Sequence, residues 1–218
     1  MLANRFLDSH QFGEICQHFT IDMGLYLTHL IQARWLKQYY TSIIASDIAQ
    51  FFLSLNHNFL SLCLSKASLN TNIIGFFNSY YSDCSTIYSW NNFSSLSFNT
   101  NIGVNQGLAL SSILSAIYLA LIIKTFKKRI KNLEIKILTD ILSSVNNGLL
   151  ISQKKSYSLS SFFLLCSYNI MSKLLLDAGL IMEHNKTKLF HFTWAQHLSN
   201  PPIDLFSIGG LIISPKSI

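Results

Sequence analysis

The stretch Ser144-Val145-Asn146-Asn147-Gly148 separates two apolar segments and decides how this part of the chain folds. Residues 136–142 and 149–152, on either side of it, are rich in isoleucine and leucine, which favours strands. Asparagine and glycine are preferred in tight hairpin turns, because both tolerate a positive φ. The sequence therefore predicts two paired strands around an Asn-Asn-Gly turn, with polar side chains at its tip.

The other segments alternate between strand-like runs and helical spacing of apolar residues. A buried strand centred on Ile43-Ile44-Ala45 ends close to Asp47. Helices are predicted over residues 22–40, 59–65, 73–81, 108–123 and 159–176, with Asp22 as the first N-cap and Gly179 as the last C-cap. A hairpin is predicted over 86–102, and strands over 181–182, 189–193 and 211–213. Because there are no internal repeats and no long linker, we expect one α+β domain.

The composition is apolar enough to raise a membrane interpretation. Half of the 218 residues are hydrophobic, only 12% are charged, and the mean hydropathy is +0.33. The uncharged run 107–123 contains three serines and begins at a Gln-Gly turn. It is also shorter than the roughly 20 residues that a spanning helix needs. A buried core helix is therefore favoured and no membrane is expected, with a small membrane protein built around 107–123 as the weakest alternative.

The charge balance favours an anionic partner. The formal net charge is +6 and the pI about 9.1, which is typical of proteins that contact nucleic acid or a membrane surface. A basic cluster follows the apolar run, and it is either a phosphate-facing surface or a solvated helix end: Lys124, Lys127, Lys128, Arg129 and Lys131. The four cysteines form no Cys-x-x-Cys motif and no signal peptide is apparent. We therefore expect reduced thiols in an intracellular protein, in the nucleus or cytoplasm.

Five groups of residues occur in an order that resembles one known family. They are Gln11-Phe12-Gly13 with Thr20 and Asp22; residues 46–57 around Asp47; Val104-Asn105-Gln106-Gly107 with 110–114; 144–148 with 149–153; and Gly179-Leu180, Glu183-His184 and Lys186-Thr187. This order resembles the reverse transcriptase domain of LINE-type (non-LTR) retrotransposons, most similar to the Tad-like group of fungi. Each motif alone is a weak signal, whereas five in order over most of the chain are a strong one.

The resemblance implies a fold. A domain of this family has the fingers and palm of a right-hand polymerase, with an antiparallel palm sheet packed on helices. Residues 1–218 would form a single domain fragment, with the fingers mainly in 1–40 and 56–105 and the palm mainly in 41–55 and 106–218. The motif that follows the palm in this family, and the thumb, are not found in the sequence. We therefore expect a fragment of a longer polyprotein with the thumb missing.

The resemblance also assigns roles to individual residues. Nucleotide addition in this family uses two Mg²⁺ ions, or Mn²⁺, which grip the attacking 3′-oxygen and the triphosphate of the incoming dNTP. Asp47 would be a metal ligand, although by itself it is also a plausible turn residue. Phe52 would exclude a ribose 2′-hydroxyl, Gln106-Gly107 would lie against the nucleotide, and Lys186 would neutralise pyrophosphate. The implied partners are an RNA template and a DNA primer.

The sequence departs from the family where the metals should bind. Asn146 and Asn147 stand in the positions of two aspartates, so two negative charges are lost. If each carboxylate supplies about 3–4 kcal/mol of transition-state stabilisation, catalysis slows by about 10⁴ to 10⁶. We therefore expect weak or lost Mg²⁺ binding and an inactive copy. The main alternative is a nucleic-acid-binding remnant that holds RNA or DNA through its basic surface without catalysis.

Further departures suggest how the copy arose. Leu53, Asn105 and Ser112 stand where the family has proline, and Leu108 where it has serine. Changes from Asp to Asn, Pro to Leu and Pro to Ser each need a single C-to-T or G-to-A mutation. The hypothesis is an element decayed by G·C-to-A·T mutation.

Overall fold

The computed structural model describes residues 6–13, 18–107, 109–132, 139–194, 203–205 and 211–213. Its helices are α2 (Thr20–Trp35), α3 (Phe51–Ser54), α4 (His57–Lys66), α5 (Thr71–Tyr81), α6 (Ala109–Asn132), α7 (Tyr157–Asp177) and the 3-10 turn η1 (His184–Lys186). Two short strands near the C-terminal end of the described chain, β10 (Ile203–Leu205) and β11 (Leu211–Ile213), form a separate antiparallel pair. The architecture is α+β, as predicted.

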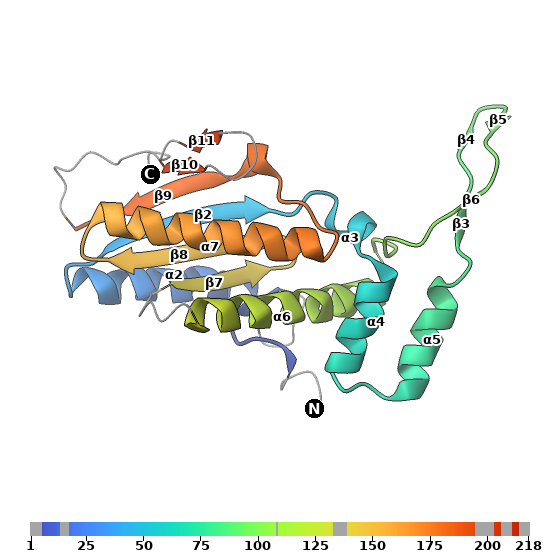
Figure 1. The fold of residues 1–218 in the computed structure, drawn as a ribbon, viewed down its shortest axis with the longest axis horizontal. Helices are drawn as coiled ribbons and strands as arrows, with labels where there is room; N and C mark the ends of the chain where they lie inside the picture. The colour runs from blue at the N-terminus through green and yellow to red at the C-terminus, as the bar shows by residue number, and fades with distance from the viewer. Residues whose placement is uncertain are drawn as a thin grey trace.

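Strand β2 (Tyr40–Asp47) pairs on both sides within a five-stranded sheet of order β1-β7-β8-β2-β9 (Figure 1). It is antiparallel to β8 (Asn147–Lys154) over its whole length and antiparallel to β9 (Lys188–Phe192) on the other side. Strand β7 (Thr139–Ser144) forms a hairpin with β8, and β1 (Gln11–Phe12) adds a parallel edge. The end of β2 therefore lies beside the tip of the β7–β8 hairpin.

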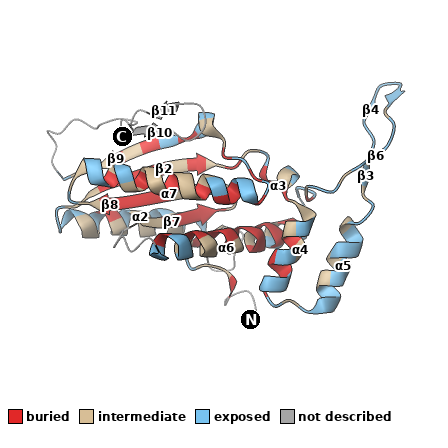
Figure 2. Ribbon diagram, viewed as in Figure 1, coloured by how far each residue is buried: buried red, intermediate tan, exposed pale blue. Residues whose placement is uncertain are grey.

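Helices cover both faces of this sheet, because successive side chains of a strand point to opposite faces. Ile44 and Leu150 belong to the larger core, which α4, α6 and α7 complete. Ile43 and Ile151, one residue along in each strand, belong to a second core under α2. Figure 2 shows burial concentrated in the sheet and in the helix sides that face it. The continuous apolar run of β2 is thus explained by burial on both faces.

A long ribbon projects from the end of α5 (Figure 1). It consists of β3 (Ser85–Thr86) with β6 (Phe98–Asn99) and, further out, β4 (Ser89–Trp90) with β5 (Phe93–Ser94). The predicted hairpin is confirmed, with Asn91-Asn92 at its turn. Its aromatic side chains face solvent, and Trp90 is 78% exposed. Part of the apolar composition is therefore surface and does not contribute to a core.

Helix α6 contains the apolar run that raised the membrane interpretation. Together α6 and α7 supply two segments, Leu110–Asn132 and Tyr157–Asp177, that are long and apolar enough to cross a membrane by length and composition. Leu114, Tyr118 and Phe126 of α6 are nevertheless almost fully buried in the larger core. The Tyr118 hydroxyl donates a hydrogen bond to the carbonyl of Ala178 and accepts one from the Asn56 amide. The prediction of a buried core helix is confirmed.

The structure corrects three local predictions. Asp22 is not the N-cap of α2: the helix begins at Thr20, and from the N3 position the Asp22 carboxylate accepts a hydrogen bond from the Phe19 amide at 2.8 Å. The helix ends at Trp35 and not at residue 40, because Tyr40 already pairs in the sheet. Residues 181–182 form no strand, only a single bridge between Met182 and Ile48.

The hairpin turn also differs from its prediction. Val145 and Asn146 form it, whereas Asn147 and Gly148 lie in β8 opposite Asp47 and Ser46. This pairing with β2 outweighs the turn preference of Asn-Gly, and it places Val145 at a φ of +53°, which is unfavourable for a β-branched residue. The predicted strand residues 136–138 and the glycine pair at 209–210 lie outside the described residues.

The remaining helix ends follow local chemistry. Asn56 caps α4 by accepting a hydrogen bond from the Phe59 amide at 3.0 Å. Gly179 ends α7 at a φ of +80° in a Schellman motif, in which the Leu180 amide bonds to the Leu175 carbonyl and the Gly179 amide to the Leu176 carbonyl. The cysteines within the described residues are free thiols, and burial raises the pKa of Cys63 to about 12. Cys16 lies outside the described residues.

The Gly179 turn predicts opposite effects of one substitution at two glycines. Gly179→Ala forces a left-handed conformation on alanine and should lower the free energy of unfolding by about 1 kcal/mol. Gly75→Ala, in the middle of α5, where an added methyl group meets nothing within 4 Å, should raise it by about 0.5–1 kcal/mol. Urea denaturation of both variants measures the difference, and changes of equal sign would contradict the assignment of the Gly179 turn.

Candidate active site

Asp47 is the last residue of β2 and lies directly opposite Asn147 of β8. The backbone amide of the next residue, Ile48, donates to the Asn146 carbonyl at 3.1 Å. The Asn146 side-chain amide in turn donates to Asp47 Oδ1 at 2.5 Å. The strand end and the hairpin tip are therefore joined by both backbone and side-chain hydrogen bonds.

Lys186 reaches the same carboxylate from the opposite side. Its Nζ lies 3.0 Å from Asp47 Oδ2, and this contact with Asp47 raises the pKa of Lys186 above its ordinary value. The Asp47 side chain is 16% exposed, whereas that of Lys186 is 65% exposed. The ammonium group thus faces solvent while it neutralises a mostly covered carboxylate.

Backbone hydrogen bonds hold η1, which carries Lys186, in place. The Glu183 amide donates to the Asp47 carbonyl at 2.8 Å, and the Ala49 amide donates to the Ile181 carbonyl at 2.8 Å. The Lys186 amide bonds to the Glu183 carbonyl within the turn. Since these bonds involve only main-chain atoms, they do not depend on which side chains the segment carries.

The side chains at this point do not fit a two-metal site. Mg²⁺ prefers carboxylate oxygens, and the set here is one carboxylate with two amides. Both oxygens of Asp47 already accept hydrogen bonds, one from Asn146 and one from Lys186. Asn147 is exposed and donates to the Asn146 side-chain oxygen at 3.2 Å. Within the described residues, no three His, Cys, Asp or Glu side chains are grouped to hold a metal ion.

The other residues assigned to the nucleotide, Phe52 and Gln106-Gly107, are not among the side-chain hydrogen-bond partners of Asp47 in the described structure. Phe52 lies on α3, is half-buried against the core, and its carbonyl accepts a hydrogen bond from the Val104 amide at 2.7 Å. This bond brings the segment that leads to Gln106-Gly107 next to α3. Gln106 and Gly107 form an exposed turn before α6, and Gly107 has a φ of +97°.

The five basic residues of α6 divide into two groups. Lys127 forms ion pairs with Asp8 at 2.7 Å and Asp140 at 3.9 Å, and Lys124 lies over the Phe6 ring at 4.1 Å. The pair with Lys127 lowers the pKa of Asp8 although burial opposes the shift. An exposed set of three cations is left at the end of the helix: Lys128, Arg129 and Lys131.

The motifs in the sequence did not predict two features of the structure. One is the set of main-chain bonds between 47–49 and 181–183, for which the sequence offered only the short apolar pair Ile181-Met182. The other is a cavity of about 570 Å³ beside His57, between α4 and α5. No motif marks it, because its lining residues come from three separate segments.

The arrangement of the sheet and its helices is that of the fingers and palm of a reverse transcriptase. Residues 3–205 match the family described as reverse transcriptase (RNA-dependent DNA polymerase), and the chain belongs to this family. No curated protein sequence matches the chain.

Three of the solved structures that are similar to the chain are telomerases from Candida tropicalis. The apo enzyme truncated from its C-terminal domain is 16% identical with a TM-score of 0.63, covering 89% of this chain and 38% of that one. The complex with a TWJ fragment of telomeric RNA is 17% identical with a TM-score of 0.60, and the match covers 84% of this chain and 30% of that one. The apo enzyme is also 17% identical with a TM-score of 0.60, and the match covers 88% of this chain and 34% of that one. The likeness shows the fold, and the chain spans about a third of these proteins.

Proposed function

We propose that the chain is the fingers-and-palm part of a reverse transcriptase from a non-LTR retrotransposon, and that this copy no longer catalyses nucleotide addition. The observation that carries the proposal is the state of Asp47, whose two oxygens are held by Lys186 and the Asn146 amide. An active site of this family needs carboxylates that grip two dications. Here a lysine ammonium supplies the positive charge that the single carboxylate requires.

The non-LTR origin and the decay rest on the sequence. The order of the five motifs supports a Tad-like ancestor. Leu53, Leu108 and Ser112 depart from the family together with Asn146 and Asn147, and most of these changes need one C-to-T or G-to-A mutation. Loss of selection on a duplicated element accounts for all of them at once.

The partners follow from the family and the charge. An RNA template, a DNA primer and a dNTP are the ligands of an active relative, and one of the similar telomerases was solved with a fragment of telomeric RNA. The net charge of +6 supports an anionic partner for this chain. We place the protein inside the cell, in the nucleus or cytoplasm, without a membrane partner.

Primer extension on an RNA template with Mg²⁺ or Mn²⁺ tests the loss of catalysis. We expect no detectable extension by the unmodified chain, and a rate about 10⁴ to 10⁶ higher for Asn146→Asp/Asn147→Asp. The matched control adds Asp47→Asn to that double variant and should abolish the recovered activity. Extension by the unmodified chain at the rate of the double variant would overturn the proposal.

A second candidate function is nucleic-acid binding without catalysis. The observation that favours it is the exposed set Lys128, Arg129 and Lys131, which stands on a single helix end with no ion pair among the described residues. Cations in such a row can follow a phosphate backbone. This function is compatible with the loss of the aspartate pair, because it needs no metal.

RNA binding through these residues should depend on salt. Three phosphate contacts on a single strand contribute about 2 to the slope of log affinity against log salt. The triple variant Lys128→Gln/Arg129→Gln/Lys131→Gln should therefore flatten the slope by about 2 in fluorescence anisotropy with an RNA oligonucleotide. Lys127→Gln, on the same helix but paired with Asp8, is the matched control and should leave the slope unchanged. Equal slopes for the triple variant and the unmodified chain would exclude this surface.

A further inference from the structure

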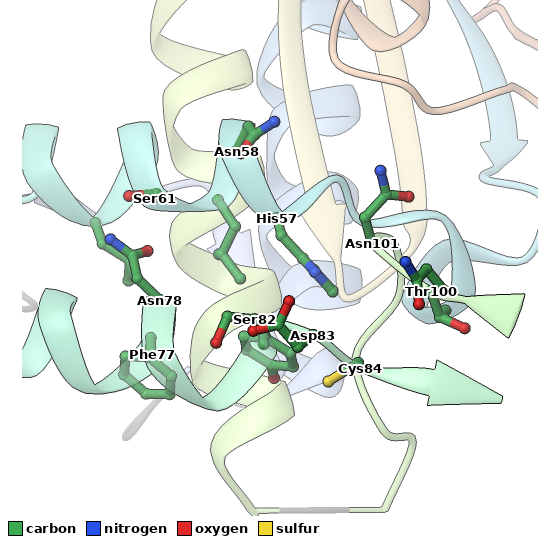
Figure 3. A pocket seen from close by; sticks show the side chains of 14 residues that line it. His57, Asn58, Ser61, Phe77, Asn78, Ser82, Asp83, Cys84, Thr100 and Asn101 are labelled. Carbon is green, nitrogen blue, oxygen red and sulfur yellow. The ribbon is translucent and has the colours of Figure 1, made fainter. Parts of the chain in front are cut away.

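The cavity beside His57 is lined by none of the residues assigned to nucleotide addition. It has a volume of about 570 Å³, within the range of small-molecule sites, and lies between α4, α5 and the segment that follows β6. In Figure 3 Asn58 and Ser61 line it from α4, Phe77 and Asn78 from α5, and Thr100 and Asn101 from the third segment. None of its 14 lining residues belongs to the Asp47 site.

Three of the polar side chains that line the cavity are amides. The side chains of Asn58, Asn78 and Asn101 are exposed and make no hydrogen bond to other described residues. Each amide offers a carbonyl acceptor and an NH₂ donor. Asparagine pairs in this way with the edges of nucleobases, which also carry donors beside acceptors.

Part of the apolar surface of the cavity is aromatic. Tyr81 lies in the wall with its ring centroid 4.5 Å from that of His57. His57 Nε2 donates to the Gly103 carbonyl at 2.7 Å, which fixes the imidazole. Phe77 adds a second ring from the same helix as Tyr81. Planar heteroaromatic ligands stack on such rings.

The charge of the lining excludes a phosphate from the cavity. No lysine or arginine lines it, and the single acidic residue is Asp83. A carboxylate repels a phosphate, and no cation is present to compensate. The part of a ligand that enters the cavity should therefore carry no negative charge, so any phosphate would remain outside it.

We propose that this cavity binds one nucleobase with its ribose, stacked on Tyr81 and held at its edge by Asn78 and Asn101. The base can come from a free nucleoside or from an unpaired nucleotide of a single strand. The second source rests on the proposed function, whereas the first does not. Neither needs a metal or the Asp47 site.

Isothermal titration of the chain with adenosine, cytidine, guanosine and uridine tests the proposal. We expect saturable binding of at least one nucleoside and none of inorganic pyrophosphate. Asn78→Ala and Asn101→Ala should each weaken binding about three- to tenfold, the effect of one lost hydrogen bond. Ser61→Trp, which fills the cavity, should abolish it.

Matched controls keep the result specific to the cavity. Asn72→Ala lies on α5 and Ser65→Trp on α4, both outside the cavity lining, and both should bind nucleoside normally. Unchanged affinity in Ser61→Trp, or binding of pyrophosphate as tight as that of nucleosides, would overturn the proposal. So would the failure of every nucleoside and of the RNA hexamer described next.

A single-stranded RNA hexamer, with and without an abasic ribose, separates the two sources. Tighter binding of the intact hexamer than of any nucleoside, lost in Ser61→Trp, supports a base presented by a strand. Equal affinities for hexamer and nucleoside support the free nucleoside. These readouts involve no nucleotide addition, so they stand or fall independently of the primer-extension result.

Discussion

The site depends on two hydrogen bonds of the Asp47 carboxylate, one from the Lys186 ammonium and one from the Asn146 amide. They join three segments that are far apart in the sequence: the end of β2, the tip of the β7–β8 hairpin and η1. Main-chain hydrogen bonds from Ile48, Ala49 and Glu183 hold the same segments together. Because these bonds involve only main-chain atoms, they would hold the palm together whichever side chains stand at its tip.

Strand β2 shows how the sequence places this carboxylate. Its run of apolar residues is buried on both faces, so the strand has helices above and below and neighbours on each side. Its register with β8 is strongly specified, since a slip of one residue would turn the side chains that belong to one core toward the opposite face of the sheet. Asp47 must then lie opposite Asn147. Amides at 146 and 147 in place of acids, as we propose, would cost the sheet little, because the backbone pairing of β2 with β8 does not depend on these side chains.

The sequence predicted the elements better than their ends. Periodicity identified α6 and α7, and the strand that ends at Asp47, because burial imposes these patterns. It misplaced Asp22 and the hairpin turn, where hydrogen bonds to Phe19 and pairing with β2 outweigh local preference. The ion pair of Lys127 with Asp8 could not be predicted from the sequence, since these residues are far apart in the chain and come together only on folding. The cavity beside His57 was missed for the same reason.

The central claim is that two amides and one lysine have replaced the metal-binding charge, and thermal denaturation in Mg²⁺ tests it most directly. The melting temperature of the unmodified chain should be the same in EDTA and in millimolar Mg²⁺. Asn146→Asp/Asn147→Asp brings like charges together, so it should melt lower in EDTA. Mg²⁺ at about 100 times its Kd should then restore about 2.7 kcal/mol, a shift of several degrees. Stabilisation of the unmodified chain by Mg²⁺, abolished by Asp47→Asn, would contradict the account.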